Sequence, residues 1–572
     1  MIDYWTHTAY LDVYGQILAG GAGPPELRDR LLTAIKSDPG SATLGALVDH
    51  LVWHADDDAE LGLVRQASDL WSRALTIYGQ VSAARDDVEA ALLSPGDPAS
   101  PARFNQATAQ LVALKNGLGT LQAQITALHA ALAPIPHLRR PHPRQESRDI
   151  ASWPFADRFL ARRTAAFLQK LLSGATDDGS TAFAAGAVSS YLGNAAGSAY
   201  LGAVVGGPRR LHRVRDRLAR NTVGAWISVN RGQPSLTELA ELVSLGAERG
   251  AETIPGPTRQ CLEAALAAAY PGLPPAGDLD TGLRRMAEHL RLLDTFGLPP
   301  LPRPLPPALA ATLTLVPGSP GGGVKVQSYG DDPNGPTSST TTPTTSDKQT
   351  AAGNICLAIL VLLVALLVAG LIICIGLLAE EGKCTPERVW EKLTGGGGHP
   401  PQVAVTAQTL VTVAQNGAGA ELVREFAKAQ GALFQGLLQA RTFLATIGLI
   451  YPTGGQLGTP LFAQFTSTPS TAQNGWPRRS PPDEFDSYIY APTSPVEQPS
   501  SSAPLPPGKD PGYLLDAVPS WIKELTHDIF GEPPSIDLDA DRGLLHRCWD
   551  VAPGTRIDDQ PLSVHLLGFH EI

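Results

Sequence analysis

Residues 104–132 are FNQATAQLVALKNGLGTLQAQITALHAAL, and their apolar positions alternate spacings of three and four over four heptads. Side chains three and four residues apart share one face of an α-helix, and a sustained alternation of this kind is the seam of a coiled coil. The stretch therefore predicts a long amphipathic helix in a mainly α protein. Its seam positions are Phe104, Ala107, Leu111, Leu114, Leu118, Leu121, Ile125, Leu128 and Leu132.

An upstream stretch keeps the same alternation, with Arg85 as its one polar interruption. SPGDPASP at residues 94–101 separates the two stretches with turn-forming residues. We expect an antiparallel helical hairpin over residues 60–133, which either protrudes as an arm or packs into a globular bundle. The upstream seam positions are Val64, Ala67, Trp71, Ala74, Tyr78, Val81, Val88 and Leu92.

The 572-residue length suits two to four domains, and the composition excludes some classes of function. A net charge of -11 argues against a general nucleic-acid binder, because such proteins need a basic surface. The five cysteines form no C-x-x-C pair, so neither a zinc ribbon nor a redox motif is indicated. Cys384 and Cys548 form a disulfide if their compartment is oxidising, or are two unpaired thiols.

The stretch ICLAILVLLVALLVAGLIICIGLL at residues 355–378 has no charge and no proline. At 1.5 Å per residue its 24 residues reach about 36 Å, enough for one crossing of a hydrocarbon core of ~30 Å. We predict one transmembrane helix here. Ala365, Ala369 and Gly370 are small enough to let two such helices approach, so a homo-oligomer is one possibility.

The charges beside this helix and the start of the chain favour opposite orientations. Lys383, Arg388 and Lys392 follow the span closely, whereas Lys348 is the one basic residue shortly before it. The positive-inside rule therefore places the C-terminal side in the cytoplasm. The first residues, MIDYWTHTAYLDVYG, do not resemble a signal peptide, which favours a cytoplasmic N-terminal region. We expect a single-pass protein of the cytoplasmic membrane, with the N-terminus cytoplasmic and the C-terminus extracytoplasmic.

Composition and periodicity divide the chain around the span. We expect a helical domain over 1–310 that contains the hairpin, and a small mixed C-terminal region at the other end. The segments in order are 1–310 helical, 311–354 a Gly/Pro/Ser/Thr linker, 355–378 the membrane helix, 399–451 helical, 452–512 disordered and rich in Pro, Ser and Thr, and 513–572 a C-terminal module.

His50 and His54 are four residues apart and so share one helix face, a spacing that zinc sites use. Residue 51 is Leu, so the acidic general base of an H-E-x-x-H protease is missing. The alternative to a metal site is a partly buried histidine pair near a helix end.

A basic stripe lies in GGPRRLHRVRDRLARN, residues 206–221. At helical spacing its side chains fall on one face, which predicts binding of anionic lipid headgroups or an acidic partner. The alternative is a solvated face with Asp216 and neighbouring acids as counter-charges. The arginines concerned are Arg209, Arg210, Arg213, Arg217 and Arg220.

Residues 182–221, AFAAGAVSSYLGNAAGSAYLGAVVGGPRRLHRVRDRLARN, resemble a helical block of the zinc-dependent phospholipase C-like family. The family block is approximately A-l-G-y-l-s-H, a-a-D-v-x-G-H, v-v-G-G-P-y-R-t-H and R-H-H-l-v-E-N. TrpThrHis at 5–7 and SATLGALVDH at 41–50 also resemble the family's opening His and its L-G-A-x-G-P-D segment. The resemblance implies a helical phospholipase C-like domain over 1–310, with the hairpin as an insertion.

Most metal-binding positions of that family are replaced here. Of the positions expected to bind metal, His7 and His212 remain. Multi-zinc hydrolysis needs clustered His and carboxylate ligands, so the resemblance implies a scaffold without catalytic residues, metal or other cofactor. The rival is a divergent zinc-dependent phospholipase that uses His7, His50, His54 and His212. The replaced positions are Tyr191, Asn194, Ser198, Asp216, Arg217 and Arg220.

The combination of such a domain with a linker, one span and a tail is similar to the membrane protein of actinobacterial contractile injection systems. That resemblance implies an adaptor that links a cytoplasmic, phage-tail-like particle to the cytoplasmic membrane and permits its firing. The implied partners are the membrane and the sheath or baseplate of the particle. A membrane sensor whose region 399–572 binds an envelope ligand is a third hypothesis.

Overall fold

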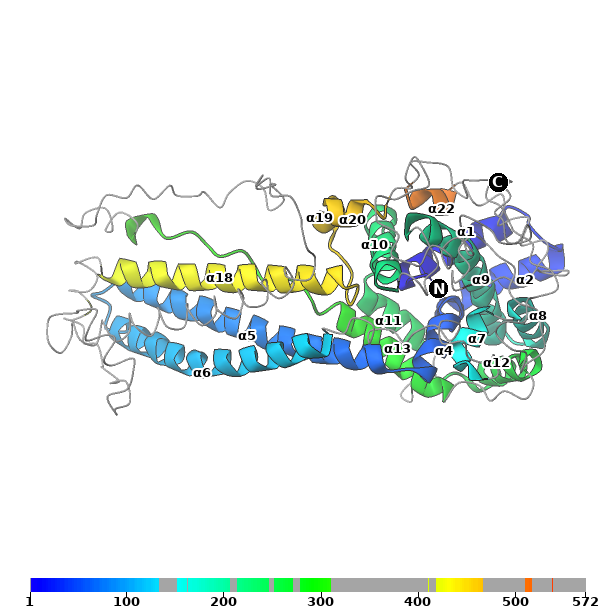
Figure 1. Cartoon of the computed structure of the whole chain (residues 1–572), viewed down its shortest axis with the longest axis horizontal. Helices are drawn as coiled ribbons and strands as arrows, with labels where there is room; N and C mark the ends of the chain where they lie inside the picture. Colours follow the sequence, from blue (N-terminus) through cyan, green and yellow to red (C-terminus); the bar gives the residue numbers. More distant parts are fainter. Residues whose placement is uncertain are drawn as a thin grey trace, which may run out of the picture. The chain divides into compact units, whose positions relative to one another are not determined.

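The computed structural model describes residues 2–132, 152–161, 163–205, 213–245, 252–270, 278–309, 410, 418–466, 510–516 and 538. Over these residues the chain is mainly helical, which confirms the predicted class. The chain forms two compact units, each assembled from segments distant in sequence (Figure 1). Unit 1 comprises Met1–Arg65, Leu132–Thr295 and Phe443–Ile572, and unit 2 comprises Gln66–Ala131 and Phe296–Thr442.

Unit 1 is a helical domain built around one long buried helix. Its helices are α1 (Tyr4–Ala19), α2 (Pro25–Ser37), α3 (Pro39–Ala46), α4 (Val48–Asp56), α7 (Phe155–Ala161), α8 (Thr164–Gly174), α9 (Asp178–Val205), α10 (Arg213–Arg231), α11 (Leu236–Leu245), α12 (Gly256–Ala269), α13 (Leu279–Leu293), α19 (Gly454–Leu457), α20 (Pro460–Ala463) and α22 (Gly512–Asp516). Residues 180–197 of α9 are buried on every side. A helix that is apolar all round belongs inside a domain, and α9 is that helix here.

Helices α3 and α9 approach so closely that their backbones touch. A Cβ atom at Gly186 would overlap the carbonyl oxygen of Ala42, and one at Gly45 would overlap that of Phe183. Glycine is therefore required at both positions, since any side chain would push the helices apart. The same contact holds the adjoining helix α4, which carries His50 and His54, beside α9.

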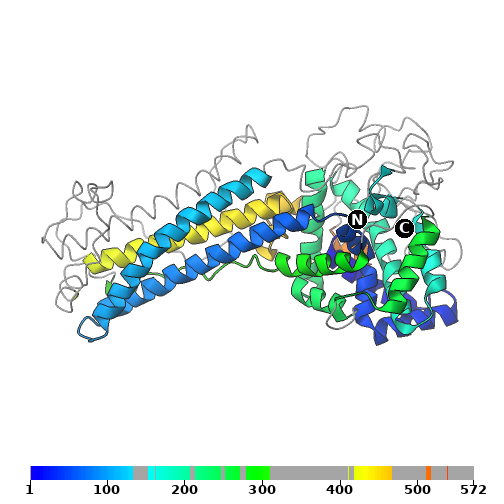
Figure 2. The same cartoon turned by 90° about the horizontal axis from the view of Figure 1, so that it is seen from below.

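Unit 2 is a bundle of three long helices, α5 (Ala59–Leu93), α6 (Ser100–Leu132) and α18 (Ala418–Thr446), which lie side by side in Figures 1 and 2. Helix α5 joins unit 2 at Gln66, and α18 leaves it at Thr442. One hydrophobic cluster draws side chains from all three helices. Its buried members are Ile77, Val81, Ala84, Val88, Ala91, Leu92, Phe104, Ala107, Leu121, Leu309, Leu410, Ala420, Val423 and Phe426.

Helices α5 and α6 cover the range expected to form the hairpin, residues 60–133. Each seam position of α5 is buried except Ala74, which is partly buried, and the seam of α6 is buried at Phe104, Ala107, Leu121 and Leu132. The turn between the helices is closed by the Ser100 hydroxyl, which donates to the Ser94 carbonyl at 2.8 Å. Because α18 shares one hydrophobic cluster with both helices, α5 and α6 belong to a three-helix bundle.

Arg85, the polar interruption of the seam, is 1% exposed in the bundle. Its Nε donates to Glu89 Oε1 at 2.7 Å, and its Nη1 donates to Gln430 Oε1 of α18 at 3.0 Å. The carbonyls of Arg303 and Pro304 accept the remaining bonds, at 2.8 and 3.1 Å. One guanidinium thus joins α5, α18 and the segment around residue 303, and its charge is matched by Glu89.

The domain boundaries differ from those expected from composition. Residues 418–442 fold with the hairpin, not as part of a separate segment 399–451, because α18 supplies the third apolar face of the bundle. Helices α19 and α20 lie within the range expected to be disordered, 452–512. A capping box between Thr453 and Gln456 starts α19, and Phe462 of α20 and the following Phe465 are buried, which explains this order.

The linker 311–354, the apolar span 355–378, Cys384, Cys548 and most of the module 513–572 lie outside the described residues. None of the helices that the structure describes is both long and apolar enough to cross a membrane.

Replacing Arg85 by Ala is expected to lower the free energy of unfolding by about 3–5 kcal/mol, because Glu89 and Gln430 lose their buried partner. Urea unfolding of the full-length protein in detergent measures the change. Arg73→Ala is the matched control on the same helix. Arg73 pairs with Asp69 at the surface, and the cost of its removal should be within about 1 kcal/mol.

The double variant Arg85→Met with Glu89→Met should recover most of the stability, since it removes both buried charges together. Equal losses for Arg85→Ala and Arg73→Ala would show that the buried network does not stabilise the bundle.

Candidate functional site

The first residues of the chain assemble the candidate site in unit 1. Asp3 caps α1, and its Oδ1 accepts from the backbone N–H groups of Trp5 at 3.0 Å and Thr6 at 3.2 Å. A cap of this kind satisfies donors that the first turn of a helix leaves unpaired. It fixes the start of α1 so that Tyr4 and His7, three residues apart, both lie buried on its inner face.

A buried carboxylate, Asp49 of α4, is the centre of the site. Its Oδ2 accepts from Nε2 of His7 at 2.9 Å and from the amide nitrogen of Asn194, on α9, also at 2.9 Å. Asp49 is 2% exposed, so these donors replace the water that an ionised carboxylate would otherwise bind. The interaction ties α1, α4 and α9 together.

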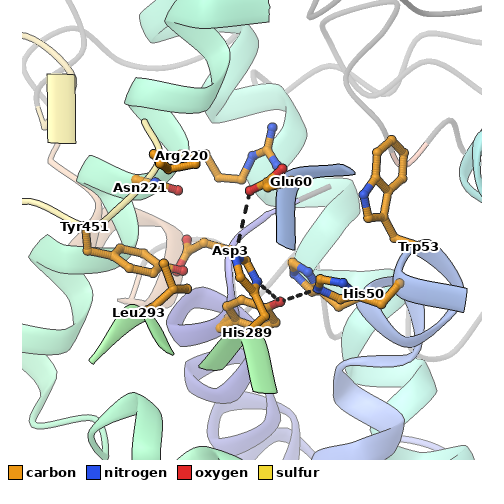
Figure 3. Close-up of a pocket in the computed structure, with 12 residues that line it drawn as sticks. Asp3, His50, Trp53, Glu60, Arg220, Asn221, His289, Leu293 and Tyr451 are labelled. Carbon is orange, nitrogen blue, oxygen red and sulfur yellow. Dashed lines mark hydrogen bonds and ion pairs between the residues drawn. The ribbon is translucent and has the colours of Figure 1, made fainter. Parts of the chain in front are cut away.

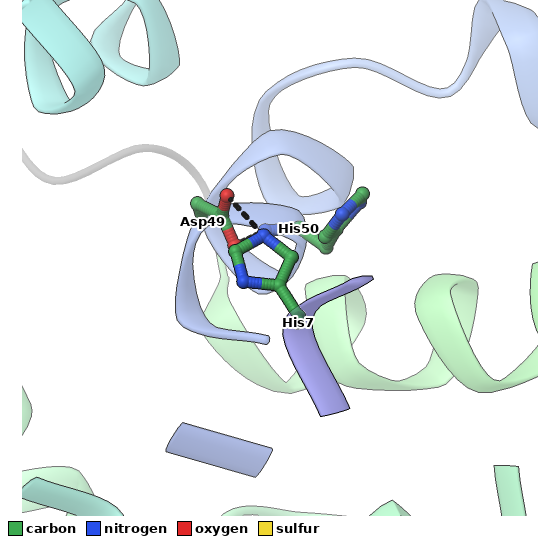
Figure 4. A group of neighbouring side chains, drawn as sticks. All are labelled: His7, Asp49 and His50. Atoms are coloured by element: carbon green, nitrogen blue, oxygen red, sulfur yellow. Dashed lines mark hydrogen bonds and ion pairs between the residues drawn. The ribbon is translucent and has the colours of Figure 1, made fainter. Parts of the chain in front are cut away.

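The same cluster binds the backbone of Ile2. Its N–H donates to Asn194 Oδ1 at 2.8 Å, and its carbonyl accepts from His50 Nε2 at 3.1 Å. Figure 4 shows the rings of His7 and His50 beside Asp49. Since a carbonyl only accepts, His50 carries its hydrogen on Nε2. Polar atoms of these side chains are therefore used to hold the beginning of the chain in place.

Tyr4 links a second group of histidines. Its hydroxyl lies 2.9 Å from Nε2 of His54 and 2.9 Å from Nδ1 of His289. Nε2 of His289 lies 3.9 Å from the carboxylate of Glu60, which Arg217 binds with both terminal nitrogens. That carboxylate favours a hydrogen on Nε2 of His289. We therefore assign the Tyr4 hydroxyl as donor to His289 Nδ1 and as acceptor from His54 Nε2–H.

Burial lowers the pKa of three histidines of the site, His50, His54 and His289. It lowers the pKa of His50 to about 3, against the opposing effect of Asp49. Burial also lowers the pKa of His289 to about 4, and holds that of His54 well below its usual value with help from His289 and His50. For Asp49 burial opposes ionisation, but His7 and His50 outweigh it and lower the pKa of the carboxyl.

A small cavity lies beside Tyr4, His54 and His289 and is also lined by His50. Its volume is about 40 Å³, and its walls include Tyr4, His50, His54, Glu60 and Tyr451 (Figure 3). A water molecule needs ~10–15 Å³ of such space, so a few waters fit and a lipid headgroup does not. In this conformation the polar groups of the cavity face a space too small for a phospholipid substrate.

Three buried groups of the site have the chemistry of metal ligands. Donor atoms of His7, Asp49 and His50 all lie within 4.8 Å of one another. Two His and one carboxylate are a ligand set that zinc accepts. However, His7 Nε2 and His50 Nε2 are engaged by Asp49 and Ile2, and the nearby Arg220 opposes positive charge at His50. The types of donor atom suit zinc. The hydrogen bonds that these atoms make, and the positive charge of Arg220 nearby, oppose zinc binding.

The prediction that the basic stripe binds lipid headgroups or an acidic partner is wrong for Arg217 and Arg220, whose side chains the structure describes. Arg217 is 5% exposed and binds Glu60 and the Gly448 carbonyl. Arg220 is 8% exposed and pairs with Asp216. The alternative prediction named Asp216 as a counter-charge at the surface, whereas this ion pair is buried. Both side chains face inward, because each finds a carboxylate there. Arg209, Arg210 and the side chain of Arg213 lie outside the described residues.

The structure brings together His7, His50 and Asn194 of the predicted positions, with His54 in the adjoining group. Tyr191 is buried, while the Ser198 side chain and His212 lie outside the described residues. Four members of the site were not predicted from the sequence. Asp49 could have been found from its place between the LGALV segment and His50. Tyr4, Glu60 and His289 belong to no recognisable motif.

No family model matches the chain, and no curated protein or solved structure is detectably similar to it. The resemblance to the zinc-dependent phospholipase C-like family therefore stays a prediction from the quoted motifs.

Acidification from pH 7 to pH 5 is expected to destabilise unit 1. In the unfolded chain His50 and His289 bind protons near pH 6.5, whereas their folded pKa values are about 3 and about 4. The unfolded state thus binds more protons throughout this window, and stability falls as the pH falls. Each histidine should cost about 2 kcal/mol at pH 5. Urea unfolding at pH 7, 6 and 5 measures this loss.

His289→Gln is the variant that isolates one contribution, because Gln can still bond Tyr4 but does not titrate. The difference in stability between pH 7 and pH 5 should shrink by about 2 kcal/mol in this variant. An unchanged pH dependence would show that His289 is not held neutral in the folded protein.

Proposed function

We propose that this chain is a non-enzymatic adaptor, anchored in the cytoplasmic membrane by the apolar segment 355–378, that holds a large cytoplasmic assembly at the membrane. The observation that supports it most is the use of Asp49. Its Oδ2 is bound by His7 and Asn194, and Asn194 in turn holds Ile2. Groups suited to chemistry serve here to stabilise a fold.

The replaced positions support the same proposal. The Asn194 amide donates to Asp49. A multi-zinc site would need a carboxylate at this position, to balance the charge of a further metal ion. Arg220 adds a fixed positive charge to the surroundings of His50. The cavity of about 40 Å³ leaves no room for a phospholipid headgroup. A scaffold of this kind binds partners through its outer surfaces.

The proposed partner is a contractile injection particle, through its sheath or baseplate, as the resemblance of the chain implies. Arg217 and Arg220 are buried, so they do not form the docking surface. We assign docking to the solvent-exposed faces of the three-helix bundle, which present α5 and α6 over more than thirty residues each.

A divergent zinc-dependent hydrolase is the second candidate. It is favoured by one observation, the convergence of donor atoms from His7, Asp49 and His50 within 4.8 Å. Zinc binding at the Nε2 atoms of His7 and His50 would require their hydrogen bonds to Asp49 and Ile2 to break. The hydrolase candidate thus predicts that zinc stabilises the folded chain, whereas the adaptor predicts that it does not.

The purified full-length protein is expected to contain far less than one zinc per chain and to leave phospholipid vesicles intact. A chelator should not change its unfolding midpoint, because no bound metal stabilises the folded state. Metal analysis, lipid chromatography and urea unfolding measure the three quantities. One zinc per chain together with phospholipid cleavage would establish the hydrolase instead.

Asn194→Asp sharpens this test. It places a second carboxylate 2.9 Å from Asp49 Oδ2 and removes a donor, so stability should fall by about 2–4 kcal/mol. Asn230→Asp, at an exposed position of α10, is the matched control and should be neutral. Full recovery of the Asn194→Asp variant by zinc would favour the hydrolase scaffold.

Affinity capture of the tagged full-length chain from detergent-solubilised membranes of its own cells should recover sheath or baseplate proteins. The double variant Leu363→Arg with Val364→Arg should retain this partner but move to the soluble fraction, since each central arginine costs about 2.5–3.5 kcal/mol in a membrane helix. Thr344→Arg with Thr345→Arg, in the linker, is the control that should stay with membranes. Capture without any particle component contradicts the proposed partner.

A further inference from the structure

Chain segments before and after the apolar segment 355–378 build one core in unit 2. Val88 and Leu92 of α5 pack in the same hydrophobic cluster as Val423 and Phe426 of α18. Arg85 Nη1 of α5 donates to Gln430 Oε1 of α18 at 3.0 Å, and both residues are buried. These contacts require both helices to be in the same aqueous compartment.

Unit 1 shows the same relation independently. Arg217 Nε donates to the Gly448 carbonyl at 2.7 Å, and the Asn221 amide donates to it at 2.8 Å. The rings of Trp5 and Tyr451 lie 4.4 Å apart, with Tyr451 buried. Residues 448–451 thus complete a domain whose remaining walls come from the first part of the chain.

The segment that contains the apolar stretch begins and ends at one cluster. Leu309 and Leu410, the described residues on either side of 310–409, are 4% and 0% exposed in the core of unit 2. Helix α18 starts beside the end of α5, where a Cβ atom at Gly419 would lie 3.2 Å from Leu92 Cγ. In Figure 1 the green segment before residue 310 and the start of α18 lie at the same end of the bundle.

One helical crossing would separate these partners by a hydrocarbon core of ~30 Å. Two crossings would return the chain to the same side but need about 40 apolar residues, whereas the stretch has 24 and the rest of 310–409 is polar or rich in Gly and Pro. We infer that the chain on both sides of 355–378 lies in one compartment, and that this segment holds the protein to one face of the membrane. The inference rests on the proposed membrane anchoring.

A shared cytoplasmic location also removes the conflict between the two sequence arguments on orientation. Lys383, Arg388 and Lys392 after the stretch then lie in the cytoplasm, as the positive-inside rule demands. The N-terminal region lies there as well. The expected extracytoplasmic location of the C-terminal part is replaced by a cytoplasmic one.

Two full-length variants with the same epitope test the inference. One carries it after Gly96, in the α5–α6 turn, and the other after Gly458, between α19 and α20; both glycines are exposed and face open space. Antibody should bind neither epitope in intact spheroplasts and both after permeabilisation. An epitope after Gly458 that is reached in intact spheroplasts, while the one after Gly96 is not, overturns the inference.

A cross-link tests the contact on which the inference depends. Leu92→Cys with Gly419→Cys should form a disulfide in oxidised membranes, so that the chain stays joined after cleavage at a protease site inserted in the linker 311–354. Leu92→Cys with Gly431→Cys is the matched control, because residue 431 lies about 18 Å further along α18 and should not cross-link. Equal joining in both pairs, or in neither, overturns the inference.

Membrane fractionation of the same variants separates this inference from the proposed function. A chain found only in the soluble fraction, with both epitopes protected, would overturn the membrane anchoring, and with it the part of the inference that concerns the membrane face. It would leave the shared compartment established.

Discussion

A buried carboxylate must find donors to replace water, and Asp49 imposes this requirement on unit 1. Leaving such a group unpaired costs several kcal/mol, so the surrounding helices are constrained to present His7 and Asn194 to it. Helices α1 and α9 thereby take fixed positions against α4. The position of Ile2 follows from this arrangement, because Asn194 and His50 both bind its backbone.

The parts of the fold that could be predicted are those whose apolar side chains repeat at regular spacing in the sequence. The positions of helices α5 and α6 were predicted from the sequence, because a seam repeats along the chain and a turn separates its halves. Helix α18 was predicted as a helix but not as the third member of the bundle, since no local pattern shows which distant face covers a seam. Arg85 was visible as an interruption, yet its partner Gln430 was not, because the pairing depends on packing.

The candidate site was predicted in part for a similar reason. His7, His50 and Asn194 were found through motifs, whereas Tyr4 and His289 are single residues whose role comes from tertiary contact. The arginines of the stripe do have helical spacing, but the prediction that they face solvent was wrong for Arg217 and Arg220. Spacing shows which side chains share a face, and only the positions of Glu60 and Asp216 show that this face is turned inward.

The long separation in sequence between Arg85 and Gln430 has a consequence for folding during synthesis on the ribosome. The two residues are 345 positions apart, and at 5–20 residues per second roughly 17–70 s of synthesis elapse between them. During that interval the nascent hairpin exposes its third apolar face, and a strongly hydrophobic stretch emerges before the helix that will cover it. Chaperones or the insertion machinery must protect both, so biogenesis of this chain is expected to depend on the pace of translation.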